Sequence, residues 1–279
     1  MTVTDIFDAV TEEASAMRTL LAERRGYRDG ENPSGERQLA ADVAADERFA
    51  ERLGALDSVG TYASEERDEP LDTGEGYAVA VDPLDGSSNL PANGPVGTIV
   101  GVYDASLPAL GRDLVAAGYV LYGPRTTMLV AREDDVTEYL VTEDGREAMR
   151  EDVTIPEEPT VFGFGGGVDD WQPAFAEYAE SVRRELKLRY AGALVADVNQ
   201  VVTNGGIFAY PALSGRPAGK LRLQFEANPV AYVVETAGGV SSTGHGSILD
   251  VEPTDLHQRV PVHVGNRDLI DCLEGGVAR

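Results

Sequence analysis

Hydrophobic positions divide the first half of the chain into two helical segments and a following series of short strands. A first helix is expected over residues 4–25, because apolar side chains recur there every three or four residues before Gly26. A second helix is expected to carry Leu39, Val43 and Leu53. Apolar runs separated by turn signals then predict strands at residues 59–63, 77–82, 97–103, 114–122, 127–132 and 136–141. The pattern indicates a mixed sheet with helices packed on it.

The second half has a different pattern, in which helices and strands alternate. Helices are expected at residues 174–186, 194–202 and 229–236, and strands at 188–191, 207–210 and 260–264. The Pro-Glu-Glu-Pro sequence at residues 156–159 is the best candidate for a boundary. The chain is therefore predicted to form an α+β domain over residues 1–156 and an α/β domain over residues 157–279, which share a cleft.

Composition narrows the class of protein. The chain has 48 acidic and 23 basic residues, a net charge of −25, and only two lysines, Lys187 and Lys220. Such a charge repels nucleic acid and anionic membranes, so neither is expected as a partner. A dispersed acidic, lysine-poor composition is typical of proteins adapted to molar salt, and the alternative is an ordinary acidic protein.

Cysteine content and apolar runs bear on the compartment. Cys272 is the single cysteine, so no disulfide forms within the chain, as expected in a reducing cytoplasm. The N-terminus lacks the pattern of a signal peptide, and no apolar run approaches the roughly 20 residues that span a bilayer. A cytoplasmic protein is predicted.

The segment of residues 81–89, Val-Asp-Pro-Leu-Asp-Gly-Ser-Ser-Asn, carries the clearest candidate chemistry. Asp82 and Asp85 stand at the end of a predicted buried strand, where Pro83 is expected to form a rigid turn. Gly86 lets the backbone approach a ligand closely, and the serines that follow offer neutral donors of the kind that bind anions. Carboxylates and a bound phosphate are both negatively charged, so they can share one site if divalent cations lie between them. The segment indicates metal-dependent phosphate chemistry, and the alternative is a polar surface turn.

Other acidic residues are candidates for the same site. Glu65 and Glu66 follow a predicted strand, and both can face one site only if the chain leaves strand geometry there. The alternative is a solvated acidic corner at residues 65–69. Asp42 on the second helix and Glu226 in an apolar context are expected to be buried, and buried acids are rare unless they are paired or bind a metal.

A series of segments resembles class I fructose-1,6-bisphosphatase, a family in the wider superfamily of lithium-sensitive, inositol-monophosphatase-like phosphatases. The segments occur in family order, and with the acidic composition they indicate a haloarchaeal type. They are residues 82–89, 97–103, 116–123, 189–197, 205–211, 219–223, 226–229 and 256–261. The resemblance implies an α/β fold, a layered sandwich in which helices alternate with mixed sheets, with an N-terminal metal-binding domain and a C-terminal substrate domain.

The resemblance also implies the roles of individual residues, whose oxygen ligands suit Mg²⁺, with Mn²⁺ or Zn²⁺ as substitutes and two or three ions in each site. Asp42 and Glu66 match residues that orient or deprotonate the attacking water. The implied metal ligands are Glu36, Glu65, Asp82, Asp85, Glu226 and the backbone carbonyl of Leu84. The implied substrate contacts are Asp85, Gly86, Ser87, Ser88, Arg189, Tyr190, Tyr210, Lys220 and Arg222. Arg189 matches an arginine that reaches a neighbouring subunit, which implies a homodimer or homotetramer.

Two departures from the family pattern bear on substrate and regulation. The loop of residues 162–168 lacks the asparagine and tyrosine that usually contact the distal phosphate, so its glycine amides are the alternative donors. Gly76 and Asp104 stand where nucleotide-inhibited relatives carry basic side chains, and the chain begins almost at the first helix. Inhibition by AMP at that site is therefore not expected.

The function implied is hydrolysis of the 1-phosphate of fructose 1,6-bisphosphate in gluconeogenesis. Two alternatives stay open at this point. One is a broader sugar- or inositol-phosphate phosphatase on the same fold, and the other is a non-catalytic cation-binding scaffold. The set of acidic residues in the motifs argues against the scaffold.

Overall fold

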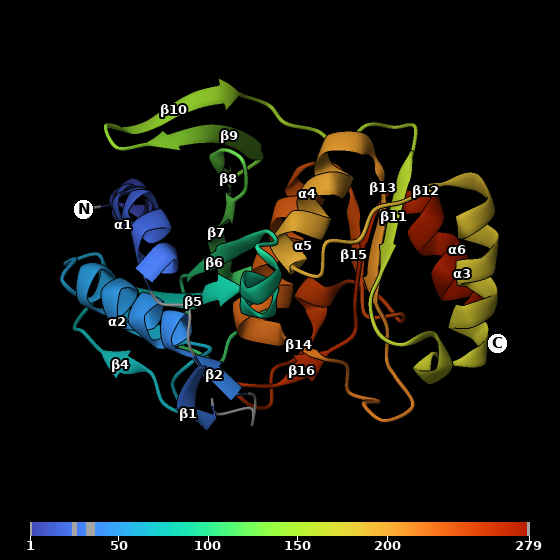
Figure 1. Ribbon diagram of the computed structural model, residues 1–279, viewed down its shortest axis with the longest axis horizontal. Helices are drawn as coiled ribbons and strands as arrows, with labels where there is room; N and C mark the ends of the chain where they lie inside the picture. The colour runs from blue at the N-terminus through green and yellow to red at the C-terminus, as the bar shows by residue number, and fades with distance from the viewer. Residues whose placement is uncertain (1, 24–26, 32–36, 278–279) are drawn as a thin grey trace.

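The molecule is built from five stacked layers, in the order helix, sheet, helix, sheet, helix (Figure 1). The computed structural model describes residues 2–23, 27–31 and 37–277. The first layer is formed by α1 (Val3–Glu23) and α2 (Ala40–Gly54), the middle layer by α4 (Leu194–Asn204) and α5 (Asn228–Thr236), and the last by α3 (Pro173–Glu185) and α6 (Arg267–Val277). These alternating layers confirm the predicted α/β sandwich.

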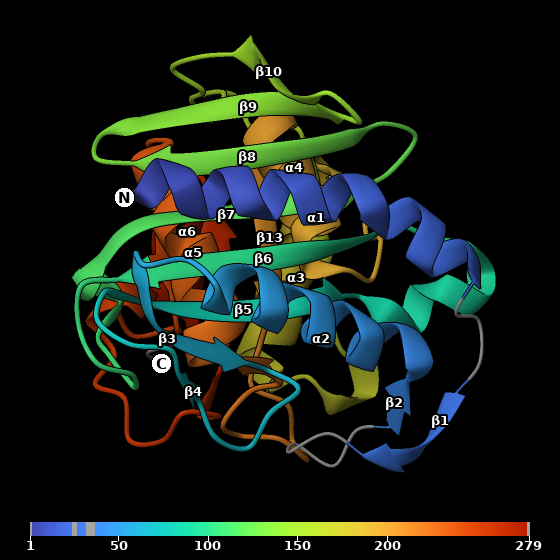
Figure 2. The same ribbon diagram turned by 90° about the vertical axis from the view of Figure 1, so that its left-hand side faces the viewer.

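The larger sheet has eight strands in the order β10-β9-β8-β7-β6-β5-β3-β4. Strands β3 and β5 run parallel, and the other neighbours are antiparallel. Figure 2 shows α1 and α2 crossing one face of this sheet. The strands are β3 (Val59–Ser64), β4 (Leu71–Asp72), β5 (Tyr77–Asp85), β6 (Val96–Tyr103), β7 (Leu114–Tyr122), β8 (Thr126–Arg132), β9 (Asp135–Thr142) and β10 (Gly145–Arg150).

The smaller sheet has five strands in the order β12-β11-β13-β17-β15, of which the first three are parallel. Its strands are β11 (Val161–Phe164), β12 (Lys187–Leu188), β13 (Gly206–Tyr210), β15 (Val240–Ser242) and β17 (Val262–Gly265). Two short pairs join β1 (Tyr27–Glu31) to β2 (Arg37–Leu39), and β14 (Leu221–Arg222) to β16 (Arg259–Val260). The single-turn helices are η1 (Ser87–Ala92), η2 (Gly111–Asp113), η3 (Val168–Asp170) and η5 (Ile248–Asp250), and η4 (Leu223–Ala227) is a π-helix.

Apolar packing explains why the layers stack. Every residue of β6 is buried, because α1 and α2 cover one face of the large sheet and α4 and α5 cover the other. On the outer side of the small sheet, Phe164 and Phe175 pack with Ile270 and Leu273, and thereby bury the inner faces of α3 and α6. The core therefore consists of three hydrophobic clusters that fill the four interfaces between the five layers, and one of them occupies both sides of the middle helical layer.

The sequence predicted most of the elements but misplaced some ends. The strand expected over residues 77–82 continues to Asp85, so Pro83 lies inside β5 and does not begin a turn there. Leu39 belongs to β2, and α2 begins at Ala40. The strand expected over residues 188–191 is only β12. Several short elements were not predicted, among them β10, β11 and β15.

Two further points concern the whole chain. No helix in the described parts of the chain has the length and apolar character needed to cross a membrane. The division into domains of residues 1–156 and 157–279 stays a prediction.

Candidate active site

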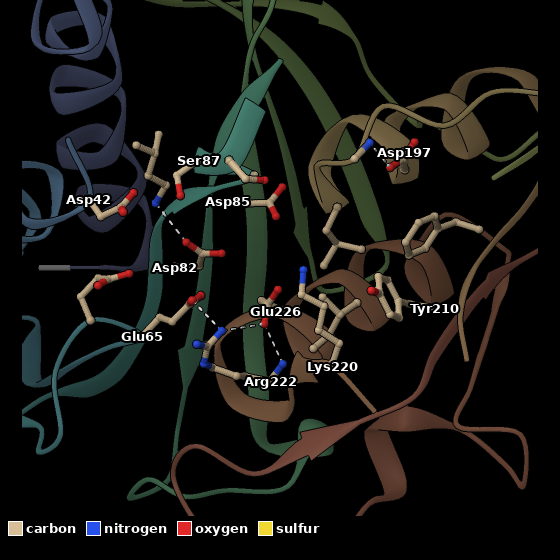
Figure 3. A pocket seen from close by; sticks show the side chains of 18 of the residues that line it. Asp42, Glu65, Asp82, Asp85, Ser87, Asp197, Tyr210, Lys220, Arg222 and Glu226 are labelled. Atoms are coloured by element: carbon tan, nitrogen blue, oxygen red, sulfur yellow. Dashed lines mark hydrogen bonds and ion pairs between the residues drawn. The ribbon is translucent and has the colours of Figure 1, made fainter. Parts of the chain in front are cut away.

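A cavity of about 500 Å³ opens where β5, η1, α2, α4 and η4 meet (Figure 3). Of the 16 residues predicted for the site, 14 line this cavity. They are Asp42, Glu65, Glu66, Asp82, Leu84, Asp85, Gly86, Ser87, Ser88, Tyr190, Tyr210, Lys220, Arg222 and Glu226. Arg189 is exposed beside β12, outside this set, and Glu36 lies outside the described residues.

Three buried carboxylates converge on one point of the cavity. One oxygen each of Glu65, Asp82 and Glu226 lies within 4.8 Å of the others, and all three residues are buried. Figure 3 shows their side chains facing the same space. Burial is the main cause that raises the pKa of Asp82 well above its usual range and the pKa of Glu226 to about 7. The negative charge of Glu65 is the next cause for both residues. Clustered buried oxygens that repel one another when charged are a fitting donor set for a hard divalent cation.

A bulge in β5 aims two aspartates into the cavity. Asp82 pairs with Ile99 and Asp85 pairs with Gly97, so three steps along β5 match two steps along β6. A bulge tolerates the missing N–H of Pro83, whose carbonyl accepts a hydrogen bond from Thr98 Oγ1 at 2.9 Å. Without the bulge, residues three apart would point to opposite faces.

Each of the two aspartates is fixed by a backbone N–H. Asp82 Oδ1 accepts from Leu84 N at 3.0 Å, and Asp85 Oδ2 accepts from Val195 N at 2.8 Å. Val195 lies in the first turn of α4, where the helix dipole favours a negative charge. Burial nevertheless raises the pKa of Asp85 to about 7, and the hydrogen bond from Val195 acts in the opposite direction.

Gly86 lets the chain turn sharply from β5 into η1. Its φ is 72°, and a Cβ atom there would lie 2.3 Å from Ala193 Cβ at the start of α4. Asn89 holds the turn in place, because its Nδ2 donates to the carbonyls of Pro95 and Ala191 at 2.9 Å each. The first N–H groups of η1 and the Ser87 and Ser88 hydroxyls thus lie beside the carboxylates.

The corner after β3 brings Glu65 and Glu66 to the same cavity. β3 ends at Ser64, Glu65 N donates to Val81 O at 3.0 Å, and Glu66 N donates to Ser64 Oγ at 3.2 Å. The chain therefore leaves strand geometry after Ser64, which is the condition under which Glu65 and Glu66 can both face one site. Across the cavity from Lys220, Asp42 lies buried in the first turn of α2.

Arg222 was predicted as a substrate contact, and in the structure it is buried among the carboxylates. Its Nη1 lies 2.6 Å from Glu65 Oε1 and 3.6 Å from Glu226 Oε2, and its backbone N donates to Glu226 Oε2 at 2.6 Å. Glu226 lies four residues after Arg222, within the π-helix η4. π-Helical turns occur frequently at functional sites. Lys220 Nζ lies over the Tyr210 ring, 5.6 Å from its centroid.

Asp197 also lines the cavity and was not among the predicted residues. It accepts hydrogen bonds from the N–H groups of Ala191 and Gly192 at 2.6 and 3.1 Å. Burial raises its pKa to about 6. An acidic residue in the first turn of an otherwise apolar helix was the available signal in the sequence.

The fold and the cavity define a phosphatase of the layered α/β type with an acidic cluster that suits a metal. Residues 8–149 match the family description "Fructose-1-6-bisphosphatase, N-terminal domain", and residues 155–277 match "Fructose-1-6-bisphosphatase, C-terminal domain". The chain belongs to the fructose-1,6-bisphosphatase family.

Curated relatives and solved structures agree with this assignment. The chain is 53% identical to "Fructose-1,6-bisphosphatase class 1 1" of Haloarcula marismortui over 99% of its length and 95% of the relative. It is 56% identical to "Fructose-1,6-bisphosphatase class 1" of Natronomonas pharaonis over 99% of its length and 98% of the relative. The holo form of Leishmania major fructose-1,6-bisphosphatase superimposes with a TM-score of 0.93 at 30% identity, covering 99% of this chain and 94% of that one. The resemblance found in the sequence motifs is thus confirmed.

Proposed function

We propose that the protein hydrolyses the 1-phosphate of fructose 1,6-bisphosphate with Mg²⁺ and releases fructose 6-phosphate and phosphate. The observation that carries the proposal is the convergence of Glu65, Asp82 and Glu226 beside the Gly86–Ser88 turn, in a chain of this family. Bound cations would supply Lewis-acid stabilisation of the phosphoryl oxygens. Oxygen donors of this kind suit Mg²⁺ better than the softer metals.

The side chains divide the reaction between them. Asp42 and Glu66 line the cavity from α2 and from the corner after β3, and between them they orient the attacking water and accept its one proton. The water attacks phosphorus on the side opposite the sugar oxygen, the bond from phosphorus to that oxygen breaks, and the sugar oxygen takes up a proton from solvent to leave as the hydroxyl group. The N–H groups from Gly86 to Ser88 hold the transferred phosphoryl group. With a cation bound, Leu84 would contribute its carbonyl, and Asp85 a carboxylate, to the ligands.

The end of the cavity at Tyr190, Tyr210 and Lys220 suits the sugar and the distal phosphate. Lys220 supplies the positive charge that the second phosphate needs. A Cβ atom at Gly165 would lie 2.3 Å from the Tyr210 ring, so a side chain at this position does not fit the present position of the ring. The loop of residues 162–168 therefore favours backbone donors for the distal phosphate, and a broader sugar- or inositol-phosphate specificity is the second candidate.

A homodimer is proposed through the exposed face beside β12, here called the β12 groove. The groove has a volume of about 530 Å³ and includes Phe164, Val168, Trp171, Leu188 and Tyr190. Val168 is 67% exposed and Leu188 is 59% exposed, which is unusual for large apolar side chains.

A second copy of the chain is the fitting occupant of the β12 groove. Arg183 lines the groove together with its ion-pair partner Glu180, and Lys187 and Arg189 adjoin Leu188 in the chain, so the basic side chains near the groove complement a chain of net charge −25. Tyr190 lines both the groove and the cavity, so a copy docked there brings its Arg189 close to this cavity. Leu188→Glu should yield monomers in sedimentation velocity, whereas Leu71→Glu, a matched change at an exposed leucine in β4, should not. Unchanged assembly of Leu188→Glu would contradict the proposed interface.

The catalytic proposal is tested by phosphate release in molar KCl with Mg²⁺. Fructose 1,6-bisphosphate should be hydrolysed faster than fructose 6-phosphate or inositol monophosphate. Asp82→Asn should abolish turnover, and Asp72→Asn, at an exposed aspartate of β4, should leave it unchanged. Preference for inositol monophosphate would favour the broader phosphatase, and no turnover of any ester would refute both candidates.

A further inference from the structure

An ion pair between a buried aspartate and a partly exposed arginine joins α2 to the corner that follows β3. Arg67 Nε lies 2.8 Å from Asp46 Oδ2, and Tyr62 donates its hydroxyl to Asp46 Oδ1 at 3.1 Å. Asp46 is only 4% exposed and Tyr62 is fully buried. Asp46 is thus an acidic side chain inside the protein with a partner on each carboxylate oxygen.

The same two segments carry the residues that we assign to the attacking water. Asp42 lies one helical turn before Asp46, so both face the same side of α2. Glu66 directly precedes Arg67 in the corner after β3. The Asp46–Arg67 pair therefore fixes how closely the Asp42 segment approaches the Glu66 segment.

The corner is held from the other half of the chain as well. His257 Nε2 donates to the Arg67 carbonyl at 2.9 Å, and the His257 ring packs on Phe225 with centroids 5.2 Å apart. Phe225 is the residue before Glu226 in η4. Arg67 is thus ion-paired through its side chain with α2 and hydrogen-bonded through its carbonyl to the block that supports the third carboxylate of the cluster.

The Arg67 side chain stays 29% exposed, so water screens the ion pair and its net contribution to stability is small. The ion pair matters because it holds the two segments in position. A misplacement of about 1 Å at a reacting group can cost about 100-fold in rate. We propose that Arg67, clamped by Asp46 and His257, is a positioning residue that sets Glu66 and Glu65 against Asp42. This inference rests on the proposed function.

The test compares Arg67→Gln, Asp46→Asn and the double variant in the Mg²⁺-dependent assay. We expect each single variant to lose about 10- to 100-fold in kcat, with KM for the bisphosphate changed by less than about threefold. The double variant should lose no more than either single variant, because the two side chains act as one unit. Arg67→Lys, which keeps the charge, should recover part of kcat.

The matched control is Arg48→Gln on the same helix. Arg48 Nε pairs with Glu13 Oε2 at 2.7 Å, between α2 and α1 and away from the cavity. We expect kcat of Arg48→Gln to stay at the wild-type value and urea unfolding to change less than in Arg67→Gln, because the Arg48–Glu13 pair is more exposed than the Arg67–Asp46 pair. Equal loss of kcat in Arg48→Gln, or unchanged kcat in Arg67→Gln, would overturn the proposal.

A second measurement separates this inference from the catalytic proposal. Amide hydrogen exchange of Glu65, Glu66 and Arg67 should become faster in Arg67→Gln and stay at the wild-type rate in Arg48→Gln. If the wild-type protein hydrolyses no ester, the proposed function fails and the exchange data alone decide whether the clamp exists. Wild-type exchange rates in Arg67→Gln would refute it.

Discussion

Gly86 offers the most direct test of the link between backbone geometry and catalysis. Its φ of 72° lies in the left-handed region, and a Cβ atom there would lie 2.3 Å from Ala193 Cβ and 2.9 Å from Ala193 Cα. Ordinary contact of such atoms begins near 3.4 Å, so the methyl group of Gly86→Ala falls 1.1 Å short of the space that it needs. The turn must therefore move away from α4 by about 1 Å.

The size of the effect follows from that displacement. The moved segment holds the N–H groups of the phosphate cradle and lies next to Asp85, and a shift of about 1 Å at such a site can cost about 100-fold in rate. The left-handed backbone adds about 1–2 kcal/mol of strain for any residue with a Cβ atom. We expect kcat of Gly86→Ala to fall about 100-fold in the phosphate-release assay.

Gly238→Ala separates the collision from the strain. Gly238 follows α5 with a φ of 83°, and a Cβ atom there would meet nothing within 4 Å. In urea unfolding both variants should lose about 1–2 kcal/mol through backbone strain, but Gly238→Ala should keep its kcat. If kcat of Gly86→Ala lies within twofold of that of Gly238→Ala, the cradle does not depend on close approach to α4 and the assignment is wrong.

Three further predictions concern buried charges. Burial lowers the pKa of His263 to about 4 in the folded protein, below its ordinary value of about 6.5. The neutral ring therefore stabilises the fold fully above pH 6.5, and this stability is lost as the pH falls. In urea unfolding, the wild type should lose about 2 kcal/mol more stability than His263→Gln between pH 7 and pH 5. Equal losses would contradict this, and His245→Gln, at an exposed histidine, is the control. Burial and then the charges of neighbouring carboxylates raise the pKa of Asp82. In protein freed of metal by a chelator, the free energy of unfolding should therefore fall as the pH rises above the ordinary aspartate range, because the unfolded state gives up this proton first. Asp82→Asn should weaken this fall and also remove the thermal stabilisation by Mg²⁺, and a wild-type response to Mg²⁺ would refute the ligand assignment. Lys220→Gln should raise KM for the bisphosphate at nearly constant stability, whereas Arg222→Gln should lower stability by about 3–5 kcal/mol, because it leaves Glu65 and Glu226 without their buried cation. Equal stability of these two variants in urea would show that Arg222 does not balance the cluster.

Local patterns in the sequence predicted the parts of the site that lie within one segment. The run from Asp82 to Ser88 combined a buried strand, two carboxylates and a glycine, and the structure places all of these beside one cavity. The bulge that turns Asp82 and Asp85 to the same side was not predicted. It depends on how β5 pairs with β6, and strand pairing leaves no local signal in spacing.

Contacts between distant segments were the part that the sequence did not reveal. Residues 65–69 were open to interpretation as a solvated acidic corner, yet Arg67 pairs with buried Asp46 of α2. Arg222 was expected to face the substrate, and it lies between Glu65 and Glu226 because β14 and η4 pack against the corner after β3. Only the tertiary arrangement decides which of several exposed-looking charges becomes buried.

The acidic cluster and Arg222 together explain why a chain with so few basic residues buries one of them. Three carboxylates held within 4.8 Å repel one another, and burial strengthens the repulsion because little water screens it. Arg222, with its side chain 3% exposed, offsets part of this charge through Glu65 and Glu226, but one guanidinium cannot balance three carboxylates and Asp85 beside them. Protons neutralise part of the remaining charge, because burial raises the pKa of Asp85 and of Glu226 to about 7, and a phosphate beside Gly86 and Ser87 would add more negative charge. We therefore expect substrate and divalent cations to favour each other's binding at this site, since each would supply the charge that the other lacks.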